Sequence, residues 1–346
     1  MSLQIPNHTL VRRIDEGAMG EVWLAEHVFQ QRQAAVKVLK YREHSAEDYT
    51  KLFMRECVLL SKFDHPNIVR IYDSGMVDER AYLVMEHLAG GTLLDRMRGS
   101  GVSVAEALTL IVQIASALGA VHQQHIVHRD LKPANIMLRD PATPVLLDFG
   151  IARQRDRSTI LGKEGVVGTA AYMSPEQISD GPLDGRSDLY ALGVLFHELL
   201  TGRPPFRGGS IPETFSQHLY SALPQLPAPL SMLQAVSNRL LAKSPSGRYN
   251  TAQDFIDALR QVYLDDESLR RQVGYAGSGM AWSSQLRALG FGLDAEHADN
   301  VRRAQGVYLV KQADPSKVAV DKPATEAFTP LEREIDELAQ LGAQVA

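Results

Sequence analysis

The hydrophobic pattern of the first part of the chain predicts β-strands. Residues 35–37 lie in an alternating apolar stretch, and residues 82–85 form a short apolar run that turns polar over 86–88. A further short run, 145–147, is wholly apolar, as in a buried strand. The pattern therefore indicates a strand-rich first segment and one more buried strand later in the chain.

Longer apolar patterns predict helices in the rest of the chain. Residues 51–62 place three leucines on one side of a helix, and residues 189–200 form a more apolar helix headed by Asp188. Residues 108–121 are nearly apolar, but they are too few to span a membrane and include a glutamine and a serine. We interpret them as a buried helix, and the chain as an α+β protein.

Two polar motifs lie between these elements. The run His-Arg-Asp-Leu-Lys-Pro-Ala-Asn occupies residues 128–135, and Asp-Phe-Gly occupies 148–150, directly after the predicted buried strand. An isolated Asp-Phe-Gly is usually an ordinary turn, but chance is a poor explanation for both motifs together. Their spacing suits phosphoryl transfer from Mg-ATP, which needs oxygen ligands for Mg²⁺ and a group that orients the incoming hydroxyl.

The residue types assign a role to each position in these motifs. Asp130 is the candidate base, and Asn135 and Asp148 are the candidate magnesium ligands. The separation of Asp130 from Asn135 suits a tight loop that presents both side chains to one cleft. Lys132 can lie between the base and the donor, where its charge would stabilise the transferring phosphate.

These motifs resemble those of the eukaryotic-like, or Hanks-type, serine/threonine protein kinases of bacteria. The resemblance implies a two-lobed fold, with a small β-rich lobe at about residues 8–87 and a larger helical lobe at about 88–264. It implies ATP and Mg²⁺ in the cleft, with Mn²⁺ as an alternative ion. The implied reaction transfers the γ-phosphoryl group of ATP to serine or threonine hydroxyls of proteins.

The resemblance extends to the residues that hold the phosphates of ATP. Residues 17–22 are similar to the latter part of a glycine-rich loop, with Asp15 where the family has its first glycine. Lys37 matches the lysine that contacts the α- and β-phosphates, and Glu56 matches its ion-pair partner on the following helix. With Asp130 and Lys132, these two complete the implied catalytic set.

The adenine pocket is implied in the same way. Met85 matches the residue at the back of this pocket, and backbone groups of Glu86 and Leu88 would hydrogen-bond the adenine. By resemblance, the nucleotide-binding residues are Ile14, Gly17, Gly20, Val22, Ala35, Lys37, Met85, Glu86 and Leu88.

Residues 149–173 resemble an activation loop, because they lack hydrophobic periodicity and are rich in Gly, Ser, Thr and Arg. Arg129 directly precedes the candidate base, and in the family such an arginine binds a phosphorylated loop residue. The candidate phosphorylation sites are Thr159 first, then Ser158 and Thr169. By resemblance, Thr169 also shapes the substrate platform beside the base.

Three further residues have scaffold roles in the family. The resemblance implies an ion pair between Glu176 and Arg248, and it implies that Asp188 supports the catalytic loop from below. We therefore assign these three residues to structure and not to chemistry.

Composition and charge exclude several other classes of function and of site. The formal net charge of −5 and the pI near 6.1 leave no basic footprint for nucleic acid. The single cysteine, Cys57, excludes an intramolecular disulfide and a cysteine-based zinc site, and it fits a reducing compartment. The N-terminus has no apolar signal core and no apolar run reaches the length of a membrane span, so we expect a cytoplasmic protein.

Residues 265–346 carry no motif that assigns a fold. Thr329 and Pro330 predict a helix start, followed by a narrow apolar stripe of Leu331, Ile335, Leu338 and Leu341. We expect a regulatory or interaction segment, whose stripe packs on the kinase domain or pairs with a partner helix, a second copy of the chain included.

Two other functions are weighed against an active protein kinase. An inactive kinase-shaped scaffold would normally have lost Lys37, Asp130, Asn135 or Asp148, and none is lost. A small-molecule phosphotransferase of the antibiotic-kinase type normally lacks the activation loop and the segment at 174–176 that seat a polypeptide. We therefore favour a signalling kinase that acts on protein Ser and Thr, its own activation loop included.

Overall fold

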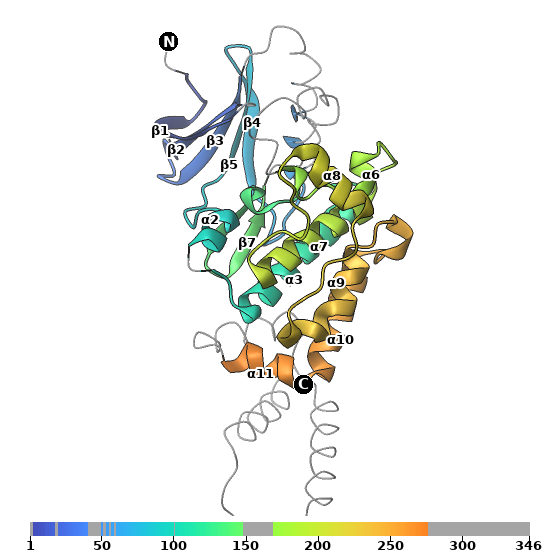
Figure 1. Cartoon of the computed structure of the whole chain (residues 1–346). Helices are drawn as coiled ribbons and strands as arrows, with labels where there is room; N and C mark the ends of the chain where they lie inside the picture. Colours follow the sequence, from blue (N-terminus) through green and yellow to red (C-terminus); the bar gives the residue numbers. More distant parts are fainter. Residues whose placement is uncertain are drawn as a thin grey trace, which may run out of the picture. The chain divides into compact units, whose positions relative to one another are not determined.

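The computed structural model describes residues 3–17, 20–40, 60–99, 101–147 and 169–275, and with them residues 50, 53, 54, 57 and 58. The chain divides into two compact units, Met1–Leu289 and Gly290–Ala346, and every described residue belongs to the first. Within that unit, a β-sheet that ends at Glu86 precedes a mostly helical part (Figure 1).

The sheet is built from five strands: β1 (His8–Glu16), β2 (Gly20–His27), β3 (Gln33–Leu39), β4 (Ile71–Val77) and β5 (Arg80–Glu86). They lie in the order β1-β2-β3-β5-β4, and all neighbours are antiparallel. The register sets Lys37 opposite Val22 on one side and opposite Leu83 on the other. The strands predicted at 35–37 and 82–85 are confirmed.

The two faces of the sheet bury different apolar clusters, because successive strand residues point to opposite faces. Val36 and Val84 lie in a cluster with Ile5 on one face. Ala35 and Met85 lie in a cluster on the other face. This second face is the one that meets the predicted helix at 51–62.

The described residues between 50 and 60 are helical, as predicted. Phe53, Cys57 and Leu60, spaced four and three residues apart, are buried, and the first two pack in the cluster that contains Ala35 and Met85. Leu60 thus lies on the buried side of this helix, as expected. Leu52 and Leu59, which the pattern also places there, lie outside the described residues.

The α-helices that follow are α2 (Leu93–Arg98), α3 (Val104–Gln123), α6 (Pro175–Ile178), α7 (Gly185–Thr201), α8 (Ile211–Tyr220), α9 (Gln234–Leu240), α10 (Ala252–Asp265) and α11 (Glu267–Tyr275). The other elements are β6 (Ile136–Asp140), β7 (Thr143–Leu146) and the 3-10 helices η1 (Pro133–Asn135), η3 (Ala228–Leu233) and η4 (Pro245–Gly247). Capping boxes start α2, α3, α6 and α10, so local sequence sets where these helices begin.

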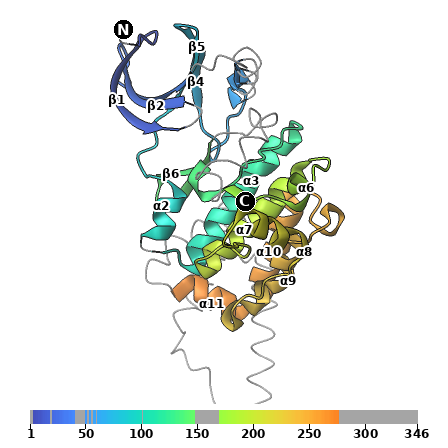
Figure 2. The same ribbon diagram turned by 45° about the horizontal axis from the view of Figure 1, so that its top comes forward.

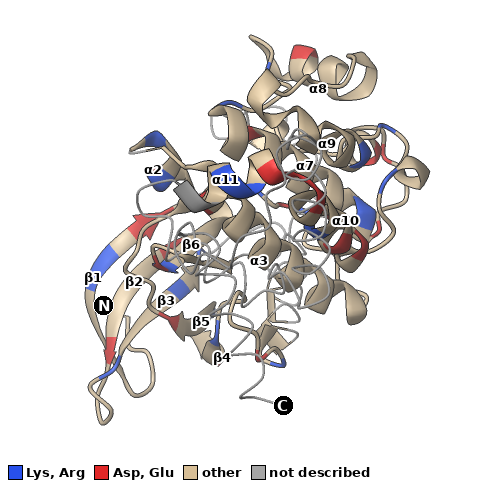
Figure 3. Ribbon diagram, turned by 90° about the horizontal axis from the view of Figure 1, so that it is seen from below, with Lys and Arg blue, Asp and Glu red and all other residues tan. Residues whose placement is uncertain are grey.

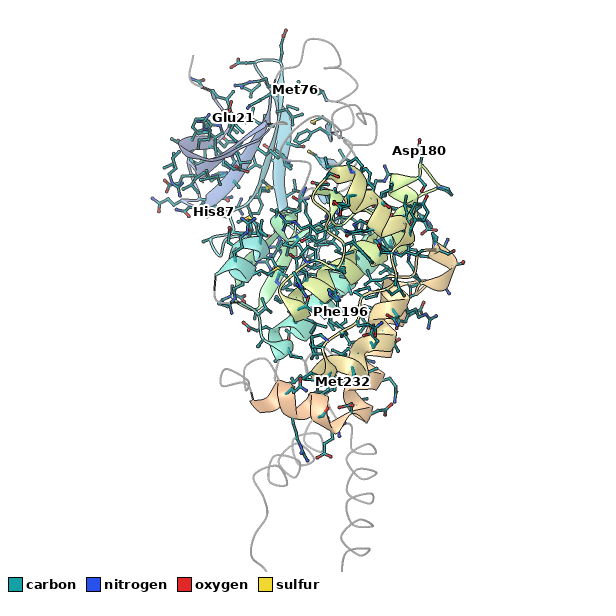
Figure 4. The ribbon with its side chains drawn as sticks, in the orientation of Figure 1. Glu21, Met76, His87, Asp180, Phe196 and Met232 are labelled. Carbon is teal, nitrogen blue, oxygen red and sulfur yellow. The ribbon has the colours of Figure 1, made fainter. Side chains whose placement is uncertain are left out.

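Helix α3 is the core of the helical part, where it contacts α7, α10 and α11 (Figure 2). Among the described helices it alone is long and apolar enough to cross a membrane, yet 72% of its apolar window is buried within the protein. It is therefore the buried helix predicted at 108–121. On the neighbouring α7, the buried ring of Phe196 meets Phe255 of α10, with ring centroids 6.2 Å apart (Figure 4).

Strand β7 is tied to the segment that leads into the sheet. Leu146 donates from its N–H to the carbonyl of Asn67 at 2.9 Å, and its own carbonyl accepts from Val69 at 3.1 Å. The N–H of Leu147 donates to the carbonyl of Asn135 at 3.0 Å. The buried strand predicted at 145–147 therefore ends beside the candidate catalytic loop.

Helix α11 lies within the segment that the sequence assigns to a C-terminal extension. Its Leu269 and Val273 are fully buried, and the helix contacts α3 and α10. The described start of the extension therefore packs with the helical core. Figure 3 shows acidic and basic residues interspersed over α10 and α11.

Candidate active site

Asp130 lies at the centre of a hydrogen-bonded loop and is 7% exposed. Asn135 donates from Nδ2 to Asp130 Oδ2 at 2.6 Å and to the Asp130 carbonyl at 2.8 Å. Lys132 Nζ lies 3.2 Å from Asp130 Oδ2 and donates to Thr169 Oγ1 at 2.9 Å. The structure thus brings together the predicted base, the lysine and one metal ligand, and Thr169 joins them as the resemblance implies.

The loop is held from below by Asp188, which is 1% exposed. Its carboxylate accepts from the N–H groups of His128 at 2.7 Å and Arg129 at 2.8 Å, and it lies 2.8 Å from His122 Nε2. Burial raises the pKa of Asp188, but His122, the nearby His128 and the Arg129 N–H lower it by more, so the carboxyl stays charged. A Cβ at Gly185 would lie 2.7 Å from His122 Nδ1, so a larger residue at the first position of α7 would displace the His122 ring that contacts Asp188.

The glycine-rich turn closes at Gly20. A Cβ there would lie 2.4 Å from the Val38 carbonyl oxygen, so the position admits only glycine. Gly17 donates from its N–H to the Gly20 carbonyl at 2.9 Å, which closes the turn between β1 and β2. Asp15 lies within β1, and its carboxylate accepts from the Glu16 N–H at 2.8 Å. The position at which the family has its first glycine is therefore a strand residue in this chain.

Most of the predicted adenine pocket lies in one apolar cluster. Ala35, Met85 and Leu88 are buried together, and Val22 packs against them. Ile14, which is 36% exposed, is not among the residues of this cluster. The sheet therefore brings Val22, Ala35 and Met85 to one face, and Leu88, just after the end of β5, joins them.

The Glu86 backbone is partly committed within the protein. Its N–H donates to the Arg70 carbonyl at 2.9 Å, so only the Glu86 carbonyl is left to accept from an adenine amino group. Its carboxylate forms an ion pair with Arg139 at 2.8 Å and accepts from the Arg70 N–H at 3.0 Å. These contacts hold the strand end in place, and the sequence did not indicate the role of the Glu86 carboxylate.

Asn135 can offer a magnesium ion the oxygen ligand that it prefers. Because its Nδ2 faces Asp130, the amide turns its oxygen to the other side, where it can serve as a hard ligand. Asp148, the second predicted ligand, directly follows Leu147, whose N–H is bonded to the Asn135 carbonyl. No group of three or more His, Cys, Asp or Glu in the described ranges could hold a metal ion. A magnesium site on Asn135 would therefore draw on Asp148, which lies outside these ranges.

The segment from Thr169 onward adds two residues that sequence reasoning missed, Gln177 and Glu198. Gln177 donates from Nε2 to the Arg129 carbonyl at 2.9 Å, and Tyr172 donates its hydroxyl hydrogen to the carboxylate of Glu198. Gln177 is visible in the sequence only as the fourth residue of a Ser-x-x-Gln capping box. Nothing in the sequence pattern marks Glu198. The predicted pair of Glu176 and Arg248 is confirmed, with 2.6 Å between Oε1 and Nη1.

Four predicted site residues cannot be placed in this arrangement. Glu56, Asp148, Ser158 and Thr159 lie outside the described residues, so their roles stay predictions.

Comparison with known proteins agrees with the geometry. Residues 8–268 match the protein kinase domain family. The serine/threonine-protein kinase PrkC of Bacillus subtilis is 40% identical over 264 residues, which cover 75% of this chain and 41% of that protein. PknF of Mycobacterium tuberculosis is 37% identical over 262 residues, which cover 72% of this chain and 55% of that protein.

A solved structure shows the same fold. The crystal structure of the Mycobacterium tuberculosis PknI kinase domain has a TM-score of 0.58 and 29% sequence identity, and the match covers 75% of this chain and 97% of that domain. The chain spans less than two thirds of the length of the curated relatives it matches. The family match, the shared fold and the loop around Asp130 agree, and the chain belongs to the protein kinase family, in its bacterial Hanks-type serine/threonine branch.

Proposed function

We propose that the chain is an active protein kinase that phosphorylates serine and threonine residues of proteins in a signalling role. The observation that carries this proposal is the single network of Asp130, Lys132, Asn135 and Thr169. An inactive scaffold has no need of a lysine held between the base and the platform.

The network suggests how the side chains act. Asp130 accepts the proton of the incoming hydroxyl, and Asn135 holds the carboxylate in the orientation for that transfer. Lys132 holds a positive charge between Asp130 and Thr169, where negative charge develops as the phosphoryl group moves. Bound ATP would supply the phosphoryl donor, and its Mg²⁺ would supply further positive charge.

Phosphoamino-acid analysis tests the acceptor class. Purified protein with Mg²⁺ and radiolabelled ATP is offered a Ser/Thr peptide, a matched Tyr peptide and an aminoglycoside. We expect phosphoserine and phosphothreonine, because Lys132 and Thr169 shape a platform for a short hydroxyl side chain on a polypeptide. Transfer to the aminoglycoside alone would favour the small-molecule phosphotransferase, and transfer to none would favour the scaffold.

We also propose that the chain phosphorylates its own activation loop. The Arg129 backbone has a positive φ of 68° and is held at both ends, by Asp188 and by Gln177. Among the described residues its buried Nε has no hydrogen-bond partner, although buried donors are nearly always paired. A phosphate on the loop would satisfy this donor with a charge-assisted bond.

Mass spectrometry of the wild type and of Asp130→Asn, both incubated with Mg-ATP, checks this proposal. We expect phosphate on Thr159 or Ser158 in the wild type and none in the variant. Thr169 should stay unmodified, because Lys132 holds its hydroxyl. A wild-type sample without phosphate at any of the three sites would contradict autophosphorylation.

For the C-terminal segment we propose a regulatory or docking role, through binding to the kinase domain, a second copy or another protein. The support is the stripe of four apolar residues near the end, whose large side chains each gain about 1.5–3 kcal/mol when buried. Truncation after Tyr275 keeps α11, and with it the buried Leu269 and Val273.

We expect the truncated chain to stay folded while its rate or its mass in solution changes. Kinase assays and light scattering on the two forms measure these quantities. Equal rates, equal masses and equal partner binding would contradict the proposed role, and loss of the fold on truncation would show that the segment completes the domain.

A further inference from the structure

The half-buried Tyr172 and the buried Glu198 form a hydrogen-bonded pair on the substrate platform. Tyr172 lies three residues after Thr169, and its N–H donates to the Thr169 carbonyl at 3.1 Å. Its hydroxyl binds Glu198, which is 8% exposed. Burial raises the pKa of Glu198 overall, although Tyr172 and two arginines lower it. The Glu198 carboxyl therefore ionises less readily than an ordinary glutamate, and it already accepts a hydrogen bond from Tyr172.

Arg207 is one of the two arginines beside this pair. It follows Phe206, which is 2% exposed and packs in the same cluster as Tyr172. The Phe206 ring lies 5.0 Å from the ring of His218, and Lys243 Nζ lies 3.9 Å above it. Because Phe206 is packed on several sides, the backbone of the next residue, the exposed Arg207, is held in place near Tyr172.

Arg98 is the second arginine, in the last turn of α2. Helix α2 contacts η1, which carries Asn135, so this helix lies beside the catalytic loop. The other basic residue of that turn, Arg96, pairs with Glu106, and the Asp95 carboxylate is engaged by Thr92. Within the described part of the chain, no ion pair joins Arg98 or Arg207 to a carboxylate.

Both guanidinium groups act on the same two side chains. The charges of Arg98 and Arg207 each lower the pKa of the Tyr172 hydroxyl and of the Glu198 carboxyl, although burial keeps both pKa values raised. Beside the buried Glu198 carboxyl there are two exposed guanidinium groups, while Asp95, whose pKa Arg98 also lowers, is engaged by Thr92. An approaching peptide therefore meets two exposed cations at this pair, whose own Glu198 carboxyl is buried.

We propose that Arg98 and Arg207 form an anion-binding rim on the substrate platform, which selects protein substrates with aspartate or glutamate near the phosphorylated serine or threonine. The inference rests on the proposed kinase function and names the class of its substrates. The alternative is that Glu198 receives a basic substrate residue, as an open carboxylate at this position would.

Three threonine peptides that differ only in the flanking residues test the rim. Glutamate, alanine or lysine occupies the same positions on both sides of the acceptor, and kcat and KM are measured with saturating Mg-ATP. Since two arginines would contact the flanks, we expect a KM for the glutamate peptide about five- to tenfold lower than for the lysine peptide. The difference should shrink at about 0.5 M salt, because the charges are exposed.

Charge reversal separates the rim from general charge effects. The double variant Arg98→Glu/Arg207→Glu should prefer the lysine peptide, with an unchanged KM for ATP. Arg203→Glu reverses an exposed arginine of the same loop whose charge acts on His197, and it should keep the wild-type preference. An equal shift in this control would overturn the assignment to Arg98 and Arg207.

The remaining outcomes are distinct from one another. A wild-type preference for the lysine peptide that Glu198→Gln removes would overturn the inference in favour of basic substrates. Equal KM values for all three peptides would overturn it outright. If the alanine peptide is phosphorylated in an Asp130-dependent manner, the kinase function stands in either case, and if no peptide is phosphorylated, both proposals fail.

Discussion

Asp130→Asn is expected to lower the turnover of peptide phosphorylation by about three orders of magnitude while the fold stays intact. The substitution removes the group that accepts the hydroxyl proton. An asparagine oxygen can still accept from Asn135 Nδ2, which now lies 2.6 Å from Asp130 Oδ2, so the loop keeps its shape. Steady-state rates with radiolabelled ATP, together with circular dichroism, measure the two effects separately.

Asp140→Asn provides the matched control for this prediction. Asp140 is an exposed aspartate at the end of β6, and its carboxylate accepts from the N–H of Ala142 at 2.9 Å. We expect near wild-type rates from this control. A wild-type rate in Asp130→Asn, or an equal loss in both variants, would refute the assignment of the base.

The catalytic loop could be predicted because its chemistry is local in sequence. Asp130, Lys132 and Asn135 lie within one short run, and a tight loop brings them into contact whatever the rest of the chain does. The strands of the sheet were visible for a similar reason, since alternation of buried and exposed positions is a local pattern.

The contacts between distant segments could not be predicted from the residues alone. Tyr172 and Glu198 are 26 residues apart, and Gln177 meets Arg129 across 48 residues. No periodicity or spacing marks such partners, because only the packing of α7 and α6 against the catalytic loop brings them together. The arginine rim was missed for the same reason.

The predicted and observed starts of one helix also differ, again because of contacts that the apolar pattern does not show. The apolar pattern placed Asp188 at the head of a helix over 189–200, whereas α7 begins at Gly185. Asp184 caps the helix by accepting from the Arg186 N–H at 2.8 Å, and the bare Gly185 lets the first turn approach His122. Asp188 therefore lies inside the helix, with its carboxylate turned to the catalytic loop.

Arg248→Met is expected to destabilise the folded chain by about 3–5 kcal/mol, because it leaves the buried Glu176 carboxylate without its cation. Arg248 is 1% exposed and donates to Glu176 Oε1 at 2.6 Å and Oε2 at 2.8 Å, while Ser187 donates to the same carboxylate at 2.6 Å. Urea unfolding at pH 7 measures the loss. Arg271→Met, which breaks an exposed pair with Glu267, should change stability little.

The pH dependence of this loss identifies the uncompensated charge as its cause. In the wild type, burial raises the pKa of Glu176, but Arg248 and Ser187 lower it below its ordinary 4.5, so the pair stabilises the fold above that pH and less as pH falls. Without Arg248, burial dominates and the pKa of Glu176 in the folded chain rises above 4.5, so protonation of Glu176 removes the unpaired buried charge. The deficit of Arg248→Met should therefore shrink as the pH falls from 7 towards 5. A deficit that is constant with pH would mean that lost packing, and not the buried charge, destabilises the variant.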